Sequence, residues 1–362
     1  MKKIATITFH NAINIGAVLQ TYALQKTIRS MGHETEVIDY RNSHLQAAYS
    51  PFYLKHKTPI WIAKTVLVAP IRFIRNQRFV KFNRKFVKVS ERIITDADFA
   101  KVNDTYDAFF VGSDQVWNPY LAGKVDGKYF LDFVTDSRKK KSYAASFGLA
   151  ELPKEFEAEY KKYLSDFSDV SVREQSAVQI VRKLNASLNP VHVLDPVFLL
   201  NATEWNEMAI SPSKKLGQYL LIFCVSDLTD DIVEYSTKFA KKNGLEPIYL
   251  ARRPQRITGV KVVINFAPQE FLGYIQNAQH IVTDSFHAMS FSIMFNKEFS
   301  LKVTKQKGLK NNRPLELLER LDIHNRTLDD NIDAIDWKSV GEKLDIEKKK
   351  SFNFLKDSIE KL

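Results

Sequence analysis

The sequence contains a single cysteine, Cys224, among 362 residues. One cysteine can form neither a disulfide within the chain nor a cysteine cluster for a metal ion, so we expect the reducing cytoplasm as its compartment. No apolar run reaches the roughly 20 residues of a transmembrane helix. The start of the chain, MKKIATITFHNAINIG, has polar residues where a signal peptide would need an apolar core.

Glycine-rich and metal-binding signatures are also missing. The segment HNAINIGAVLQTYALQ, which follows the first predicted strand, has one glycine instead of the G-x-G-x-x-G pattern, which argues against a nicotinamide or flavin enzyme. The chain has no Walker loop, no G-x-S-x-G turn and no H-E-x-x-H helix. The pair Asp96 and Asp98 is a weak metal signature, and His280 and His287 are poorly spaced for one ion. We therefore expect neither a metal ion nor a resident cofactor.

Acidic residues are absent from one long stretch of the chain. The net charge is +11 and the pI about 9.3, and no Asp or Glu occurs between Tyr40 and Ser90. Basic and aromatic residues alternate in this stretch: Lys55, Lys57, Lys64, Arg72, Arg75, Arg78, Lys81, Arg84, Lys85 and Lys88 with Trp61, Phe73, Phe79, Phe82 and Phe86.

Three interpretations fit this basic amphipathic stretch. It could be a solvated helical face packed on a domain, a contact with an anionic membrane surface, or a nucleic-acid patch. No RRM, KH, zinc-finger or helix-turn-helix pattern accompanies it. We therefore favour the first two in combination and expect no nucleic-acid partner.

Short apolar runs alternate with helical periods along the chain, which predicts an α/β fold with parallel sheets. The predicted strands are Ile4–Phe9, Thr35–Asp39, Ala108–Gly112, Ser142–Ser146, Val170–Val172 and His192–Leu194, then Tyr219–Val225, Glu246–Leu250, Val262–Ile264, His280–Thr283 and Phe299–Val303. The clearest predicted helices are Ala17–Ser30, Glu174–Lys183, Asp230–Lys242, Pro268–Asn277 and Pro314–Leu321.

The length and a hydrophobic fraction of 44% allow two doubly wound domains. We predict an N-terminal Rossmann-like domain over residues 1–205, with the basic stretch as an insertion at about 45–90, and a C-terminal Rossmann-like domain over 206–335. Residues 336–362 are predicted to form one or two helices that close the molecule. Ligands of open parallel sheets bind beyond the carboxyl ends of the strands, so two such domains predict a central cleft.

The stretch TDSFHAMSFSIMFN, residues 283–296, crosses from a predicted strand to a predicted helix. It places His287 on the first turn of that helix, where unpaired N–H groups and the helix dipole attract anions and lower the pKa of an imidazole. Ser285 is a candidate N-cap, and Asp284 is a candidate for keeping the imidazole protonated. Alternatively, Ser285 only caps the helix and His287 is a hydrogen-bonded polar residue without a catalytic role.

Polar groups also follow two N-terminal strands. Asn14 and Gly16 are predicted to form a sharp turn after the first strand. This turn either has a purely structural role or contacts an anion or a sugar. The segment VGSDQVWNP follows the strand at Ala108. Its polar residues Ser113, Asp114 and Gln115 beside the flat ring of Trp117 suit the binding of a carbohydrate. Alternatively, the segment is a capped turn and Trp117 is a core residue.

Charged side chains complete the predicted cleft. Arg173 follows one strand and suits two-pronged binding of a carboxylate or phosphate, while Asp195 follows another strand and could orient it. An interdomain salt bridge between the two is the alternative. The loop KQKGLKNNRP adds further basic and polar groups: Lys305, Lys307, Asn312 and Arg313.

Seven motifs together resemble the polysaccharide pyruvyl transferase family: NIGAVLQTYALQ, FVGSDQVWNP, SYAASFG, SVREQS, VLDPVFLL, VTDSFHAMSFSIMF and NNRPLELLERL, in this order. The resemblance implies a GT-B-like fold of two Rossmann-like domains around a cleft. It also implies an enzyme that moves the enolpyruvyl unit of phosphoenolpyruvate onto sugar hydroxyls and leaves a pyruvate ketal and phosphate. Phosphoenolpyruvate is then a co-substrate and not a cofactor.

By position, the resemblance implies that His287 is the general acid, that Arg173 binds the donor and that Asp195 is a nearby acidic residue. The chain departs from the pattern at Ser285, where many members have arginine. Arg313 or Lys305 is expected to replace that contact. The acceptor would be a glycan or a lipid-linked oligosaccharide, which would explain the basic aromatic stretch by peripheral contact with the inner membrane face.

Two other functions compete with this one. A nucleotide-sugar glycosyltransferase would share the architecture but release a nucleoside diphosphate. A glycan or membrane binder without catalysis would have lost its donor site at Ser285. No sequence feature determines an oligomeric state.

Overall fold

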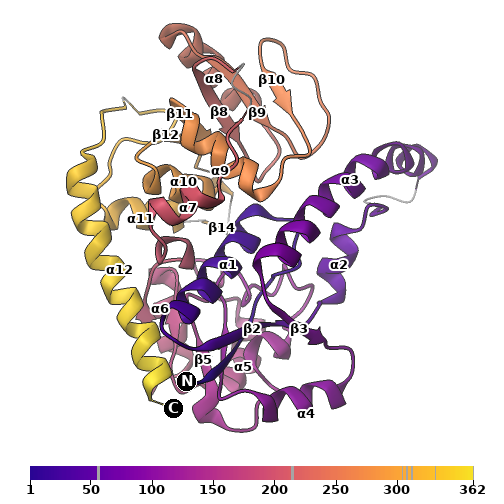
Figure 1. Ribbon diagram of the computed structural model, residues 1–362, viewed down its shortest axis with the longest axis vertical. Helices are drawn as coiled ribbons and strands as arrows, with labels where there is room; N and C mark the ends of the chain where they lie inside the picture. Colours follow the sequence, from indigo (N-terminus) through magenta and orange to yellow (C-terminus); the bar gives the residue numbers. More distant parts are fainter. Residues whose placement is uncertain are drawn as a thin grey trace.

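The computed structural model describes residues 1–54, 58–212, 216–303, 305–306, 309–310, 313–330 and 332–361, with only the backbone given for 305–306 and 309–310. Two separate five-stranded parallel sheets form two α/β domains, one above the other in Figure 1. This is the predicted class, two Rossmann-like domains in a GT-B-like arrangement.

The N-terminal sheet has the order β3-β2-β1-β4-β5. Its strands are β1 (Lys3–Ile7), β2 (Glu34–Asp39), β3 (Val89–Arg92), β4 (Ala108–Val111) and β5 (Lys140–Ser142). A short parallel pair, β6 (Ser171–Val172) and β7 (Val191–His192), lies beyond β5 through single bridges. Helices α1 (Ile15–Ser30), α4 (Asp96–Thr105), α5 (Lys154–Leu164) and α6 (Gln175–Leu184) belong to this domain, with short 3-10 turns η1 (Gly127–Phe130), η2 (Ser137–Lys139) and η3 (Pro196–Phe198).

The predicted strands are found here with small shifts at their ends, except that β5 ends at Ser142, where the predicted strand Ser142–Ser146 begins, and that β3 was not predicted. Its sequence, VSER, contains one apolar residue and two exposed charges. An edge strand of this kind has little apolar periodicity to reveal it. The central strands behave differently because both of their faces are covered, and all four residues of β4 (AFFV) are buried.

The C-terminal sheet repeats this topology in the order β10-β9-β8-β11-β12. Its strands are β8 (Tyr219–Phe223), β9 (Glu246–Leu250), β10 (Lys261–Val263), β11 (His280–Thr283) and β12 (Glu298–Leu301). Helices α7 (Ala202–Met208), α8 (Asp230–Asn243), α9 (Pro268–Asn277), α10 (Phe286–Met294) and α11 (Arg313–Arg320) accompany it, and β13 (Lys305–Gln306) pairs with β14 (Leu309–Lys310).

The last helix, α12 (Trp337–Glu360), returns from the C-terminal domain to the N-terminal one (Figure 1). Leu355 and Ile359 join the cluster of buried side chains that contains Ile4 of β1. The backbone N–H of Leu194 donates a hydrogen bond of 2.9 Å to the Ser351 hydroxyl. A single helix therefore ties the two domains together along one side.

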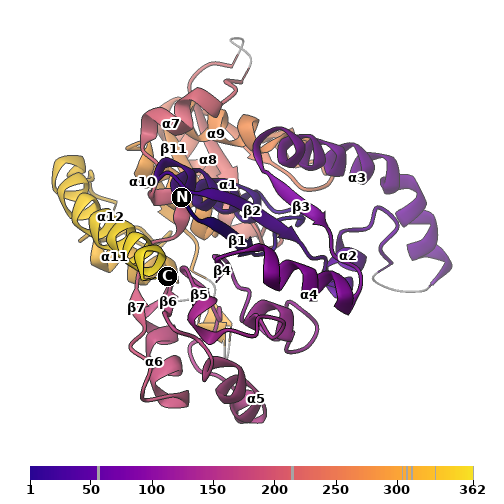
Figure 2. The ribbon, with the colours of Figure 1, turned by 60° about the horizontal axis from the view of Figure 1, so that its bottom comes forward.

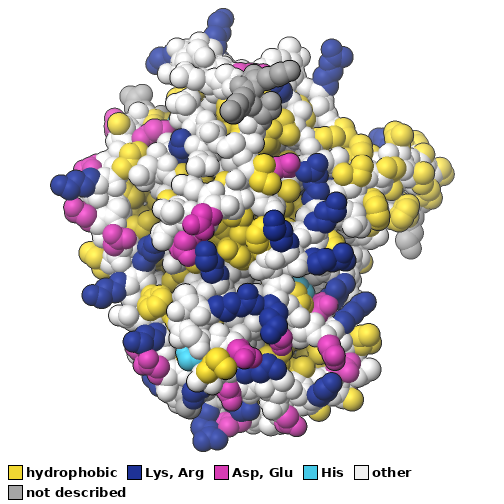
Figure 3. All heavy atoms as spheres, in the orientation of Figure 1, with side chains coloured by type: hydrophobic (Ala, Val, Ile, Leu, Met, Phe, Trp, Pro, Cys, Tyr) yellow, Lys and Arg dark blue, Asp and Glu magenta, His cyan; other side chains and the backbone are white. Residues whose placement is uncertain are grey.

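The basic stretch forms two helices, α2 (Ser43–Tyr49) and α3 (Pro59–Phe86), which project from the body in Figures 1 and 2. The inner part of α3 is anchored because Phe79 and Phe82 are buried in the main core. The outer part exposes apolar side chains, which gather on the projecting lobe of Figure 3; they include Ile60, Ile62, Val66, Leu67, Phe73 and Ile74. Lys55 and Lys57 lie outside the described residues. No helix in the described part of the chain is long and apolar enough to cross a bilayer.

Candidate active site

A cavity of about 210 Å³ lies between the carboxyl ends of the two sheets. The β1–α1 turn, the segment after β4 and the start of α10 all line it, as parallel strands predict. From the predicted set it contains Asn14, Gly16, Asp114, Gln115, Asp284, Ser285, His287 and Arg313. Strand ends from both domains therefore converge on one enclosed space.

His287 is held by contacts from the opposite domain. It lies on the first turn of α10 with its side chain 12% exposed, and its Nε2 is 3.4 Å from Oδ2 of Asp195. The other ring nitrogen faces the β1–α1 turn, where a Cβ on Gly16 would come within 2.0 Å of Nδ1. The imidazole ring therefore packs directly on Gly16, and any side chain at this position would displace the ring.

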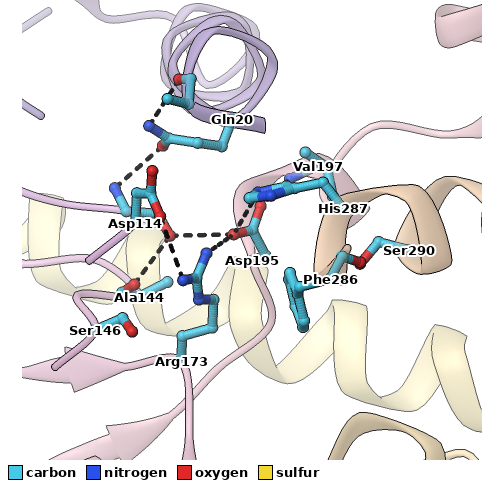
Figure 4. Close-up of polar contacts among 12 residues, drawn as sticks. Gln20, Asp114, Ala144, Ser146, Arg173, Asp195, Val197, Phe286, His287 and Ser290 are labelled. Atoms are coloured by element: carbon cyan, nitrogen blue, oxygen red, sulfur yellow. Dashed lines mark hydrogen bonds and ion pairs between the residues drawn. The ribbon is translucent and has the colours of Figure 1, made fainter. Parts of the chain in front are cut away.

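Asp195 connects the elements around the histidine (Figure 4). It caps η3 through the N–H of Val197, and its Oδ2 accepts hydrogen bonds from Arg173 (2.6 Å) and Ser113 (3.3 Å). The carboxyl is buried, which opposes its ionisation, but the adjacent His287 and Arg173 outweigh that effect and hold the pKa of Asp195 well below its usual range. Asp195 is therefore an ionised carboxylate beside the His287 ring.

Arg173 lies behind the cavity and not on its wall. Its side chain is 1% exposed, and its second Nη is 3.4 Å from Oδ1 of Asp114. The guanidinium carbon is 4.9 Å from the centre of the Phe286 ring, and Nε is buried without a hydrogen-bond partner. Two carboxylates therefore occupy most of the fork that we predicted for the donor. The Arg173–Asp195 pair also lies within the N-terminal domain, which corrects the alternative of an interdomain bridge.

Arg313, at the first residue of α11, lies at the cavity beside this cluster. Burial and the positive charge of Arg173 lower the pKa of Arg313 to about 10. Two neighbouring guanidinium groups create a positive potential that an anion would relieve. Of the expected replacements for the family arginine at Ser285, Arg313 therefore faces the cavity. The Lys305 side chain and Asn312 lie outside the described residues.

The remaining predicted residues divide into cavity walls and supports. Asn14 caps α1 and Ser285 caps α10, each by accepting a backbone N–H at 3.3 Å. Gln115 lines the cavity and accepts a hydrogen bond from Asn118. Ser113 is buried and donates to Ala144 and Asp195, so it positions Asp195 from behind.

Asp284 and Trp117 differ from what the sequence predicted. The carboxylate of Asp284 accepts the backbone N–H groups of Val225 (2.7 Å) and Ser226 (3.0 Å), so it holds the loop after β8. The carboxylate that approaches His287 is Asp195 instead. Trp117 is fully buried, donates to the Tyr129 carbonyl and stacks on Phe130. We therefore assign Trp117 to the core and remove it from the candidate sugar platform.

Sequence reasoning missed three contributors. Phe286 packs against Arg173, Tyr49 of α2 lines the cavity, and Glu174 accepts hydrogen bonds from Ser146 and the following backbone N–H groups. Phe286 and Glu174 stand inside motifs already recognised, but nothing in those motifs says which side chain turns inward. Tyr49 carries no local signal, because only the fold of the projection brings it to the cavity.

A sequence search of curated proteins gives no match. Solved structures of similar fold include an alpha-glucosyltransferase in complex with UDP and a 13-mer DNA (8% identity, 98% of this chain and 95% of that chain, TM-score 0.47). They also include a putative UDP-N-acetylglucosamine 2-epimerase from Listeria monocytogenes (11%, 95% and 94%, 0.48) and the UDP-GlcNAc 2-epimerase from Neisseria meningitidis (11%, 96% and 98%, 0.46).

The family comparison covers most of the chain, including the strand ends of both domains that build the cavity. The sequence model described as "Polysaccharide pyruvyl transferase" matches residues 14–300, from the cap of α1 to β12. The chain therefore belongs to the polysaccharide pyruvyl transferase family.

Proposed function

We propose that this protein transfers the enolpyruvyl group of phosphoenolpyruvate to sugar hydroxyls and forms a pyruvate ketal. One observation carries the proposal: His287 approaches the buried carboxylate of Asp195, at 3.4 Å, on the wall of a cavity that Arg313 also lines. Phosphoenolpyruvate is small and highly negative, so it needs fixed positive groups. Arg313 and the start of α10, which line the cavity, supply them.

In the proposed reaction, Nδ1 of His287, the ring nitrogen turned away from Asp195, donates its proton to the methylene carbon of phosphoenolpyruvate. The C=C electron pair forms the new C–H bond, and a cationic carbon remains next to the ester oxygen. A sugar hydroxyl attacks this carbon and its proton returns to His287. The C–O bond to phosphate then breaks, with the electron pair leaving on phosphate, and a second hydroxyl attacks the resulting cationic carbon to close the ketal while its proton passes to the phosphate.

Asp195 is the positioning residue in this scheme. Its Oδ2 lies 3.4 Å from Nε2 of His287 and orients the ring by charge, while Arg173 and Ser113 hold Asp195 in place. Arg173 therefore acts on the reaction through Asp195. Of its atoms, the Nη beside Asp114 is the one best placed to contact phosphoenolpyruvate.

Phosphate release tests the proposal directly. We expect the protein to release phosphate from phosphoenolpyruvate in the presence of an acceptor from a panel of lipid-linked and free glycans. His287→Ala should lower the rate by about 10²–10⁴-fold, which is the usual contribution of a general acid. His324→Ala, at an exposed histidine, is the matched control and should leave the rate unchanged. Full activity of His287→Ala would refute the assignment, and release of UDP or GDP from a nucleotide sugar would favour the glycosyltransferase alternative.

We further propose that the acceptor is lipid-linked and that the protein works at the cytoplasmic membrane face. The exposed apolar side chains of α3 and the lack of acidic residues between Tyr40 and Ser90 support this. We expect salt-sensitive co-sedimentation with anionic vesicles. Leu67→Asp should weaken it, and Ile346→Asp, at an exposed residue of α12, should not. No binding of the wild-type protein at low salt would contradict the proposal.

A further inference from the structure

A second cavity of about 300 Å³ lies at the root of the α2–α3 projection, where it meets the loops after β8 and β9 of the other domain. Four arginines line it, Arg72 and Arg75 from α3 and Arg252 and Arg253 from the loop after β9. We call this cavity the arginine pocket. Asp227 is the one acidic residue on its described wall.

Protein contacts orient these guanidinium groups without neutralising most of them. Arg75 donates to the Arg252 carbonyl (2.8 Å), Arg72 to the Tyr53 carbonyl (3.1 Å) and Arg252 to the Ser226 carbonyl (3.2 Å). The one described carboxylate contact is with Asp227, which lies 3.3 Å from Arg253 and 3.9 Å from Arg252. Carbonyl oxygens hold a guanidinium in place but leave its charge for a ligand.

Arg75 carries the clearest sign that the pocket suits an anion. Its Nε is buried and has no hydrogen-bond partner. Burial and the neighbouring Arg252 and Arg72 together lower its pKa. Like charges gathered around a buried, unpartnered donor are costly unless a polyanion binds among them.

The arginine pocket is a neighbour of the active-site cavity, because a third cavity shares wall residues with both. A smaller cavity of about 130 Å³ lies between the two. It shares Asn14, Ile15 and Tyr49 with the active-site cavity, and Ile13, Arg75 and Arg252 with the arginine pocket. The three cavities therefore lie in a row from the active site to the arginines, as an extended ligand would require.

We propose that the arginine pocket binds the diphosphate of a glycosyl diphosphate acceptor whose sugar lies in the active-site cavity. This rests on the proposed function, and it names the chemical class of the acceptor. Four guanidinium groups match the several negative charges and many acceptor oxygens of a diphosphate. The same helix, α3, also exposes Phe73 and Ile74, so an apolar surface suited to a lipid chain lies on the element that carries Arg72 and Arg75.

Calorimetric titration with inorganic pyrophosphate, in saturating phosphoenolpyruvate to fill the active-site cavity, tests the pocket. We expect binding to wild-type protein and at least ~10-fold weaker binding to Arg75→Gln and to Arg252→Gln. Arg84→Gln removes the same charge from an exposed position on the same helix and should bind like wild type. Both pocket variants should bind phosphoenolpyruvate normally.

Two further probes identify the carrier. Geranyl diphosphate binding more tightly than pyrophosphate would support a lipid carrier, and UDP doing so would support a nucleotide carrier of the same diphosphate. No pyrophosphate binding by wild type, equal loss in Arg84→Gln, or weakened phosphoenolpyruvate binding in the pocket variants would each overturn the proposal. Absence of phosphate release from phosphoenolpyruvate would instead remove the proposed function, while pyrophosphate binding that depends on Arg75 would still establish the pocket.

Discussion

The two domains have the same strand order but contribute different parts of the site. The N-terminal domain supplies a buried network of charges, with Arg173 between Asp195 and Asp114. The C-terminal domain supplies the start of one helix, with His287 on its first turn. Similar scaffolds thus carry unlike chemistry, and the imidazole meets its carboxylate only across the domain boundary.

This division has a physical reason. A buried guanidinium requires carboxylates close by, so Arg173, Asp195 and Asp114 are most stable within one rigid domain. His287 contributes only its ring, so it can come from the other domain if the surface on which it packs leaves room for that ring. Gly16 leaves this room because it has no side chain. The relative position of the domains therefore controls the proton donor more than it controls the charge network.

Removal of the shared carboxylate should have the largest effect. Asp195→Asn removes the negative charge that lies 2.6 Å from Arg173 and 3.4 Å from His287, so we expect at least a ~100-fold slower phosphate release. Loss of a buried partner costs about 3–5 kcal/mol of stability. Because the folded-state pKa is depressed, the stability from ionised Asp195 is present above pH ~4 and is lost as pH falls.

Denaturation at pH 7 and at acid pH measures both consequences of Asp195→Asn. The difference between variant and wild type should shrink as pH falls. Asp345→Asn, at an exposed residue of α12, should match wild type throughout. Wild-type stability of Asp195→Asn at pH 7 would contradict a buried charge network.

Gly16→Ala tests the boundary itself. The added methyl group would meet the His287 ring at 2.0 Å, so the ring or the domains must move, and we expect ~10–100-fold lower kcat with a normal melting temperature. Gly341→Ala, where no atom lies within 4 Å of the added methyl group, should be active and no less stable. Equal activity of both variants would show that the position of the His287 ring does not depend on the lack of a side chain at Gly16.

The C-terminal domain should lose stability in mild acid through His280. Burial lowers the pKa of this histidine to about 3, and its Nε2 contacts the Ser300 hydroxyl at 2.7 Å. Unfolding lets the imidazole take up a proton below its ordinary pKa of about 6.5, so stability falls as pH drops from there toward 3, by roughly 2 kcal/mol at pH 5. Melting of wild type and His280→Gln at pH 7 and pH 5 measures this, and an equal loss in both would exclude His280 as the cause.

Asp284→Asn should have the smallest effect. Its carboxylate holds the loop after β8, so we expect an activity change of only about threefold and a stability loss of about 1–2 kcal/mol. The pH dependence of kcat should remain that of wild type. A shifted acid limb would instead restore Asp284 as the group that keeps His287 protonated.

The sequence predicted the architecture well because buried parallel strands are continuous apolar runs, as in β4 and β8. It also located the cavity, since polar residues after such strands must gather at one sheet edge. The sequence could not show which of these residues line the cavity and which only hold other residues in place. Ser113 and Gln115 stand two residues apart in one motif, yet one is buried behind Asp195 and the other lines the cavity.

By itself, the sequence determined which residues follow each strand, the excess of positive charge before Ser90 and the helix start at His287. The tertiary structure decided which of those residues meet: His287 with Asp195 and Gly16, Arg173 with two carboxylates, and four arginines at one pocket. The physical reason is that periodicity and propensity act over a few residues, whereas these contacts join elements far apart in the chain and depend on how two domains pack.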